Sequence, residues 1–130
     1  MKGNRGKDTR PEQQIRSALH AAGLRFRKHI RPVRQLRCHA DIVFSREQVA
    51  VFVDGCFWHH CPEHGRVPGR NALYWEEKMK RNQVRDMRNT EILRKEGWLV
   101  LRYWEHEAPK TIAQEILNAV LDRRARVGLV

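Results

Sequence analysis

The stretch "HADIVFSREQVAVFV", residues 39–53, decides the fold class of this chain. It contains two short runs rich in β-branched residues, 39–44 and 48–53, which are joined through the polar segment "SREQ", residues 45–48. Runs of this length and composition predict β-strands, and the short polar link between them predicts a hairpin. The second run is apolar over "VAVFV", which indicates a strand that is buried on both faces.

Helix and strand patterns continue on both sides of this hairpin. Residues 10–23 carry an apolar face with helical spacing, with Pro11 in the first turn and Gly23 as the stop. Residues 73–96 are rich in helix formers, and Pro109 starts a last helix with one apolar face: Ile112, Ile116 and Val120. Two further strands are predicted by "LRFRKHI" and "WLVLRYW", residues 24–30 and 98–104.

These elements predict the order α-β-β-β-loop-α-β-α. We therefore expect an α/β fold in which a small mixed β-sheet is flanked by helices. A length of 130 residues fits one core, so we expect a single domain over residues 10–130. Residues 1–9 are polar and basic, and we expect them to form a flexible arm.

The charge of the chain favours a polyanionic partner. The net charge is +11, from 26 Lys and Arg against 15 Asp and Glu. The basic residues concentrate in residues 25–37 and 78–88, which favours nucleic acid over the alternative of a merely soluble basic protein. No apolar run is long enough for a membrane span and the N-terminus lacks an apolar signal core, so we expect a cytoplasmic protein without a membrane partner.

A zinc site is indicated by four residues with metal-ligand chemistry: Cys56, Cys61, His64 and His106. The first three follow the spacing C-x4-C-x2-H, and two cysteines with two histidines form a normal tetrahedral zinc set. Four protein ligands close such a site, so the zinc would be structural. His59 or His60 could replace one of these ligands. Alternatively, Cys56 is merely buried, the histidines lie on the surface and no metal binds. Cys38 lies outside the cluster.

Two carboxylates predict a second metal. Asp41 interrupts an apolar strand pattern, which is costly unless it faces a cleft, a partner or a metal. Asp54 ends the next strand, so a hairpin can bring the two side chains together. Neighbouring carboxylates repel each other, and oxygen ligands of this kind suit magnesium. The alternative is that each acid forms an ordinary salt bridge.

Groups for acid–base chemistry and for stacking lie nearby in the sequence. His59 could act on water, because the ordinary pKa of histidine lies near neutrality. Asp86 could orient His59, or it could simply pair with a neighbouring arginine. Three aromatic side chains suit stacking on bases or wedging between base pairs: Phe57, Trp58 and Trp75. The alternative for these aromatics is a small cluster around the zinc.

Three stretches together resemble the very-short-patch repair mismatch endonucleases. They are "RGKDTRPEQQIRSALHAAGLRFRKH", "VAVFVDGCFWHHCPEHG" and "YWEEKMKRNQVRDMRNTEILRKEGWLVLRYWEHE", and the similarity covers roughly residues 5–120. The resemblance implies a restriction-endonuclease-like fold, catalytic Mg²⁺ and structural Zn²⁺. It also implies nicking of double-stranded DNA beside the thymine of a T·G mismatch. We expect a monomer, with mismatch-repair proteins as further candidate partners.

The resemblance also implies roles for individual residues. Asp41 matches the metal-binding aspartate of the family, and Val53 matches a position that offers its backbone carbonyl to the metal. His59 matches the catalytic histidine, Asp86 the acid that supports it, and Glu12 an acid of the N-terminal helix near the active site. The aromatic set matches intercalating residues, and the four zinc candidates match zinc positions.

Two positions depart from the family pattern. Asp54 lies where some members carry a second catalytic histidine, and it could bind metal instead. Ala40 replaces the proline that usually precedes the central aspartate. A related nuclease with another DNA target and a non-catalytic, zinc-stabilised DNA-binding module remain the alternative functions.

Overall fold

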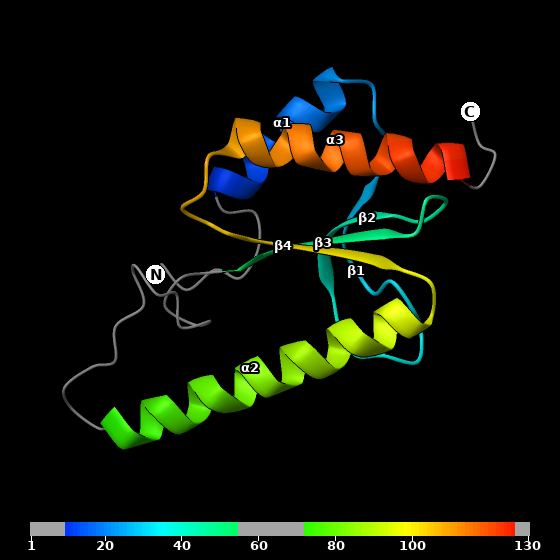
Figure 1. Cartoon of the computed structure of the whole chain (residues 1–130). Coiled ribbons are helices and arrows are strands. Elements are labelled where there is room, and N and C mark those ends of the chain that lie inside the picture. The colour runs from blue at the N-terminus through cyan, green and yellow to red at the C-terminus, as the bar shows by residue number, and fades with distance from the viewer. Residues whose placement is uncertain (1–9, 55–71, 127–130) are drawn as a thin grey trace.

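The computed structural model describes residues 10–54 and 72–126, which form three helices and four strands (Figure 1). Their order is α1 (Arg10–Ala21), β1 (Arg27–Ile30), β2 (Ala40–Phe44), β3 (Val49–Asp54), α2 (Ala72–Lys95), β4 (Leu99–Trp104) and α3 (Pro109–Arg126). This order confirms the elements predicted from the sequence. None of the described helices is long and apolar enough to cross a membrane.

The sheet is mixed, as predicted, with the strand order β1-β2-β3-β4. The first two neighbouring pairs are antiparallel, and β3 and β4 are parallel. The chain therefore crosses from β3 to β4 through α2. The carboxyl ends of β3 and β4 and the amino end of β2 consequently meet at one edge of the sheet, which we call the β3–β4 exit edge. Asp41 and Asp54 both lie there.

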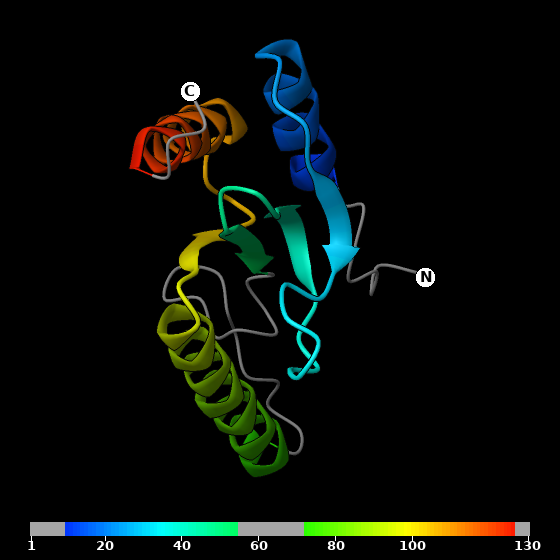
Figure 2. The same ribbon diagram turned by 90° about the vertical axis from the view of Figure 1, so that its right-hand side faces the viewer.

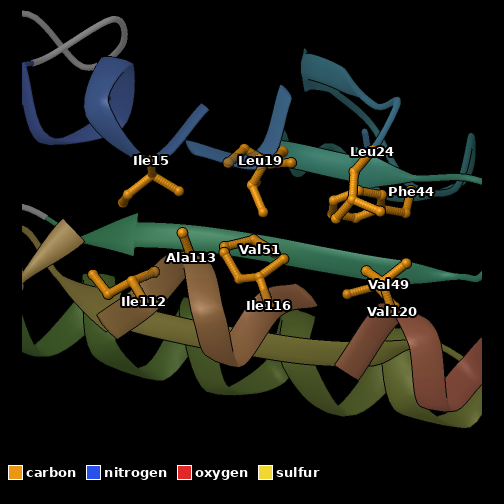
Figure 3. Packing of buried hydrophobic residues seen from close by; sticks show 11 residues of the cluster. Ile15, Leu19, Leu24, Phe44, Val49, Val51, Ile112, Ala113, Ile116 and Val120 are labelled. Atoms are coloured by element: carbon orange, nitrogen blue, oxygen red, sulfur yellow. The ribbon is translucent and has the colours of Figure 1, made fainter. Parts of the chain in front are cut away.

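The two faces of the sheet carry different helices (Figures 1 and 2). Helices α1 and α3 cover one face, where Ile15 and Leu19 of α1 meet Ile116 of α3 and Val51 of β3 (Figure 3). These four side chains are fully buried. Burying an aliphatic side chain of this size contributes roughly 1.5–3 kcal/mol, so this layer is a main source of stability.

Helix α2 lies against the opposite face. There Leu93 of α2 packs with Ala50 and Phe52 of β3 and with Val100 of β4. Because successive side chains of a strand point to opposite faces, β3 alternates between the two clusters, which confirms the prediction of a strand buried on both faces.

Glycines end α1 and α2 in the same way. Gly23 and Gly97 have φ values of 87° and 92°, in the left-handed region that favours glycine. Beyond each glycine the next backbone N–H bonds back into the helix, from Leu24 to the Leu19 carbonyl and from Trp98 to the Leu93 carbonyl. Leu24 therefore belongs to the end of α1, and β1 begins at Arg27, later than predicted.

Candidate active site

Asp41 is fixed at the β3–β4 exit edge by the backbone of the neighbouring strand. Its Oδ2 accepts a hydrogen bond of 2.6 Å from the Val53 N–H, and its side chain is only 14% exposed. On the opposite side of β2, the neighbour of Asp41 in β1 is His29. His29 lies between the β1–β2 pairs Lys28–Ile42 and Ile30–Ala40. Asp41 therefore lies between two strands with one oxygen held by Val53.

Glu12 and His29 complete a compact group with Asp41. Glu12 lies in the first turn of α1 and is 1% exposed. Its Oε2 lies 3.3 Å from His29 Nε2, while His29 Nδ1 lies 3.7 Å from Asp41 Oδ1. One ligand atom from each of the three residues lies within 4.8 Å of the others, a spacing that fits a metal ion. The Arg16 Nη1, 3.2 Å from Glu12 Oε2, offsets part of the negative charge.

The backbone of His29 is itself unusual. Its φ is 54°, a left-handed conformation that is uncommon for a residue other than glycine and costs roughly 1–3 kcal/mol. The conformation is held by the surrounding sheet and accompanies the placement of the imidazole between Glu12 and Asp41. Such outliers concentrate at functional sites, so the backbone and the side chains point to the same place.

The surroundings of Asp41 disfavour its ionised form. Burial is the largest cause and raises the pKa of Asp41 to about 7, with further contributions from the Glu12 carboxylate and from Asp54, while the Val53 N–H opposes the shift. A divalent cation would reverse this balance, because it neutralises the carboxylates that otherwise repel each other. The chemistry of the donor set therefore fits a cation.

Asp54 has a different partner. Both of its carboxylate oxygens accept hydrogen bonds from Arg102 Nη1, at 3.1 and 3.2 Å. Asp41, Asp54 and Asp86 nevertheless line the same cavity, of about 270 Å³, between the exit edge and α2. Asp86 also lies 4.0 Å from Arg85 Nε, so the simple salt bridge considered for this acid is present as well.

Several of the predicted site residues lie outside the described part of the chain. These are Cys56, Phe57, Trp58, His59, Cys61 and His64, together with the alternative zinc ligand His60. Trp75 lies in the first turn of α2, but its side chain is also outside the description. His106 is described: it is exposed and is the second residue after β4. The residue between them, Glu105, donates its N–H to the Asp54 carbonyl.

Two residues of the site were missed by sequence reasoning. His29 belongs to a strand of alternating apolar and basic residues, and nothing in that pattern distinguishes it from a solvent-exposed side chain. Arg102 did carry a signal, because it is a lone charge inside the apolar run "WLVLRYW". The same reasoning that singled out Asp41 would have found Arg102.

Comparison with known proteins identifies the family. The sequence model of the family described as "DNA mismatch endonuclease Vsr" matches residues 1–64. The type II nicking enzyme V.NaeI of Lentzea aerocolonigenes is 46% identical over 124 residues, which cover 94% of this chain and 72% of that enzyme. The chain belongs to the Vsr family.

Other Vsr-type relatives agree with this membership. The type II nicking enzyme V.XorIIP of Xanthomonas oryzae is 41% identical over 120 residues, 91% of this chain and 86% of that enzyme. The DNA mismatch endonuclease Vsr of Escherichia coli K12 is 35% identical over 102 residues, 76% of this chain and 62% of that enzyme. The family suggested by the sequence motifs is thereby confirmed.

Proposed function

We propose that this member of the Vsr family is a magnesium-dependent endonuclease that nicks double-stranded DNA beside the thymine of a T·G mismatch. The observation that carries the proposal is the group formed by Glu12, His29 and Asp41, whose ligand atoms lie within 4.8 Å of one another at the exit edge. Family membership supports the reaction class. We further propose that the sheet and its helices form the core of a restriction-endonuclease-like domain.

The chain offers oxygen ligands for the catalytic metal. In our proposal Asp41 binds Mg²⁺ together with the backbone carbonyl of Val53, and Glu12 lies close enough to contribute a second carboxylate. Imidazole is a poorer ligand for magnesium than oxygen. His29 therefore serves to orient the two carboxylates. When bound, the metal supplies positive charge that stabilises the developing negative charge on the phosphate.

The remaining steps fall to side chains near the cavity. His59 accepts the proton of the attacking water, and Asp86 orients His59. The position of Asp86 on the cavity that Asp41 also lines supports this assignment. Phe57, Trp58 and Trp75 open the base stack at the mismatch, where a wobble pair resists distortion less than a matched pair.

A structural zinc site is part of the same proposal. Its ligands are Cys56, Cys61, His64 and His106. The described ligand, His106, supports the proposal because it follows β4 at the exit edge, and β3 ends at the same edge with Asp54, which precedes the other three ligands in the sequence. Zinc bound in this way would tie that segment to the end of β4.

DNA binding is supported by the distribution of charge. The net charge of +11 includes exposed basic side chains along α2, on the same side of the sheet as the cavity: Lys80, Arg81, Arg85 and Arg88. Such a row of cations suits a phosphate backbone. We expect one monomer to bind one mismatch site.

The substrate is tested by a nicking panel. End-labelled duplexes with T·G, T·A and C·G at the same position are incubated with the protein and Mg²⁺, in several flanking sequences. We expect nicks only in the T·G duplex, and only in the strand that carries the mismatched thymine. Equal nicking of the matched duplexes contradicts the mismatch specificity.

A second candidate function has support of its own. The relatives V.NaeI and V.XorIIP are named type II nicking enzymes, so a nuclease with a different DNA target is the alternative. In the same panel, that function predicts nicks in a matched duplex of defined sequence, methylated or unmethylated.

A further inference from the structure

Arg102 is a cation beside the candidate active site that is held by several contacts. Its Nε donates to Thr90 Oγ1 at 3.2 Å and its Nη1 to both oxygens of Asp54. Its guanidinium carbon lies 4.2 Å from the centre of the Phe52 ring. Contacts from α2, from β3 and from a ring face fix the guanidinium in one orientation, although its side chain remains 25% exposed.

The register of the sheet explains this placement. Arg102 pairs with Phe52 across the parallel strands β3 and β4, and Asp54 lies two residues further along β3. Side chains two residues apart point to the same face, so all three point toward α2. Arg102 thereby lines the cavity that also contains Asp41.

The contacts leave part of the guanidinium unused. Among residues 10–54 and 72–126, Arg102 makes hydrogen bonds through Nε and Nη1 only. Within that part of the chain no hydrogen bond uses the two N–H groups on Nη2, so both can donate to a ligand in the cavity. Arginine matches the oxygens of a phosphate group especially well, because its donors form a planar fork.

We propose that Arg102 contacts a phosphate of the strand that is nicked, and that Asp54 is the positioning residue for Arg102 and not a ligand of the metal. The inference rests on the proposed endonuclease function. A phosphate that approaches Asp41 also meets the carboxylates of Asp54 and Asp86. Arg102 neutralises one of these and turns that part of the cavity into a site for an anion.

The geometry argues against Asp54 as a metal ligand. Both of its oxygens already accept hydrogen bonds from Arg102. By contrast, the ligand atoms that converge belong to Glu12, His29 and Asp41. Asp54 therefore acts on the substrate through Arg102.

The contact with phosphate is tested by a coupling experiment. Binding of a T·G duplex is measured for the Asp41→Asn protein, with and without Arg102→Gln, on duplexes that carry a neutral methylphosphonate at single positions around the nick. We expect the methylphosphonate at one position to weaken binding by about 10-fold when Arg102 is present. In the Arg102→Gln protein the same methylphosphonate should weaken binding by less than about 2-fold, as for two partners in contact. Additive losses at every position overturn the proposal.

Matched variants separate this role from a structural one. Arg126→Gln removes an exposed arginine that pairs with Asp122 at the end of α3, and we expect no coupling to any phosphate. If Arg102→Gln melts below the assay temperature, Arg102→Lys replaces it, because lysine keeps the charge beside Asp54 but loses the planar fork. An Arg102→Lys protein that retains the full coupling contradicts the proposed contact.

The role of Asp54 is tested by magnesium dependence. For Asp54→Asn we expect single-turnover nicking to slow by about 10- to 100-fold, with the half-saturating Mg²⁺ concentration changed by less than about 2-fold. An increase of about 10-fold or more in that concentration identifies Asp54 as a ligand and overturns the proposal. The parental protein is the reference. If it nicks no duplex, the proposed endonuclease function is wrong. If it nicks, but no coupling between Arg102 and a phosphate is found, only the proposed role of Arg102 is wrong.

Discussion

The Asp41 carboxylate accepts a hydrogen bond of 2.6 Å from the backbone N–H of Val53. This contact ties the start of β2 to the end of β3 and leaves Asp41 Oδ1 facing His29, 3.7 Å away. Within this carboxylate, Oδ2 is thus held by the backbone of β3, while Oδ1 faces the residues that we propose to bind metal. The arrangement leads to several predictions about stability, metal binding and activity.

The first prediction concerns the stability of the metal-free protein. Burial raises the pKa of Asp41 to about 7 in the folded state, above its ordinary value of 3.8. The folded protein therefore holds this proton more tightly than the unfolded chain. The stabilisation is fully present below pH 3.8 and is lost as the pH rises toward 7. At about 1.36 kcal/mol per pKa unit, the loss between about pH 5 and 8 amounts to roughly 3 kcal/mol at most.

Asp41→Asn should remove this dependence. Without added divalent cation, we expect the variant to gain stability relative to the parent as the pH rises from about 5 to 8, in urea unfolding followed by circular dichroism. Asp122→Asn, which alters an exposed acid of α3, is the control and should leave the pH profile unchanged. If stability depends on pH in the same way in the parent and in Asp41→Asn, the pKa of Asp41 is not raised in the folded state.

The second prediction concerns magnesium. Because a bound cation stabilises the folded state, millimolar Mg²⁺ should raise the melting temperature of the parent. Glu12→Gln removes one of the two buried carboxylates of the group. We expect the Mg²⁺ affinity of this variant to fall by about 10-fold, as is typical when a residue that supports a metal site is replaced. Isothermal titration calorimetry measures both proteins, and equal affinities would remove Glu12 from the proposed site.

The third prediction concerns the layer between α1, α3 and the sheet. Ile116 is fully buried in this layer. Ile116→Ala should lower the free energy of unfolding by about 2–5 kcal/mol, since it removes buried methyl groups and leaves a cavity. Leu121→Ala is the matched control on the same helix, because Leu121 is 47% exposed, and it should have little effect.

The fourth prediction concerns zinc. Protein purified without added metal should contain one zinc ion per chain by elemental analysis, and His106→Ala should lose most of it. His20→Ala, at the end of α1, is the control and should retain zinc. Parental protein that is free of zinc would contradict the proposed ligand set.

The sequence predicted the fold well because local signals coincided. Apolar periodicity predicted α1 and α3, and a composition rich in helix formers predicted α2. Gly23 and Gly97 marked the ends of α1 and α2 with the backbone conformation that glycine favours. The hairpin over residues 39–53 was predicted from two apolar runs and a polar turn. The largest difference is at the start of β1, which was placed three residues too early, because Leu24 looks like a strand residue but closes the end of α1.

The site was less predictable because its contacts are tertiary. Asp41 stood out as an acid in an apolar strand, whereas Glu12 was found only through the family resemblance. An acid in the first turn of a helix usually serves the helix dipole, and nothing local shows that this one is buried against His29. Arg102 lies far from Asp54 in sequence, so their pairing depends on the parallel register of β3 and β4.

The most direct test of the central claim is the effect of Asp41→Asn on nicking and binding of the same T·G duplex. We predict that the parent nicks this duplex only with Mg²⁺, and that Asp41→Asn loses at least about 1,000-fold in single-turnover rate, in line with the loss of a main electrostatic contribution. Its affinity for the duplex should stay close to that of the parent. Nicking by Asp41→Asn at the parental rate, or parental nicking without divalent cations, would contradict the account.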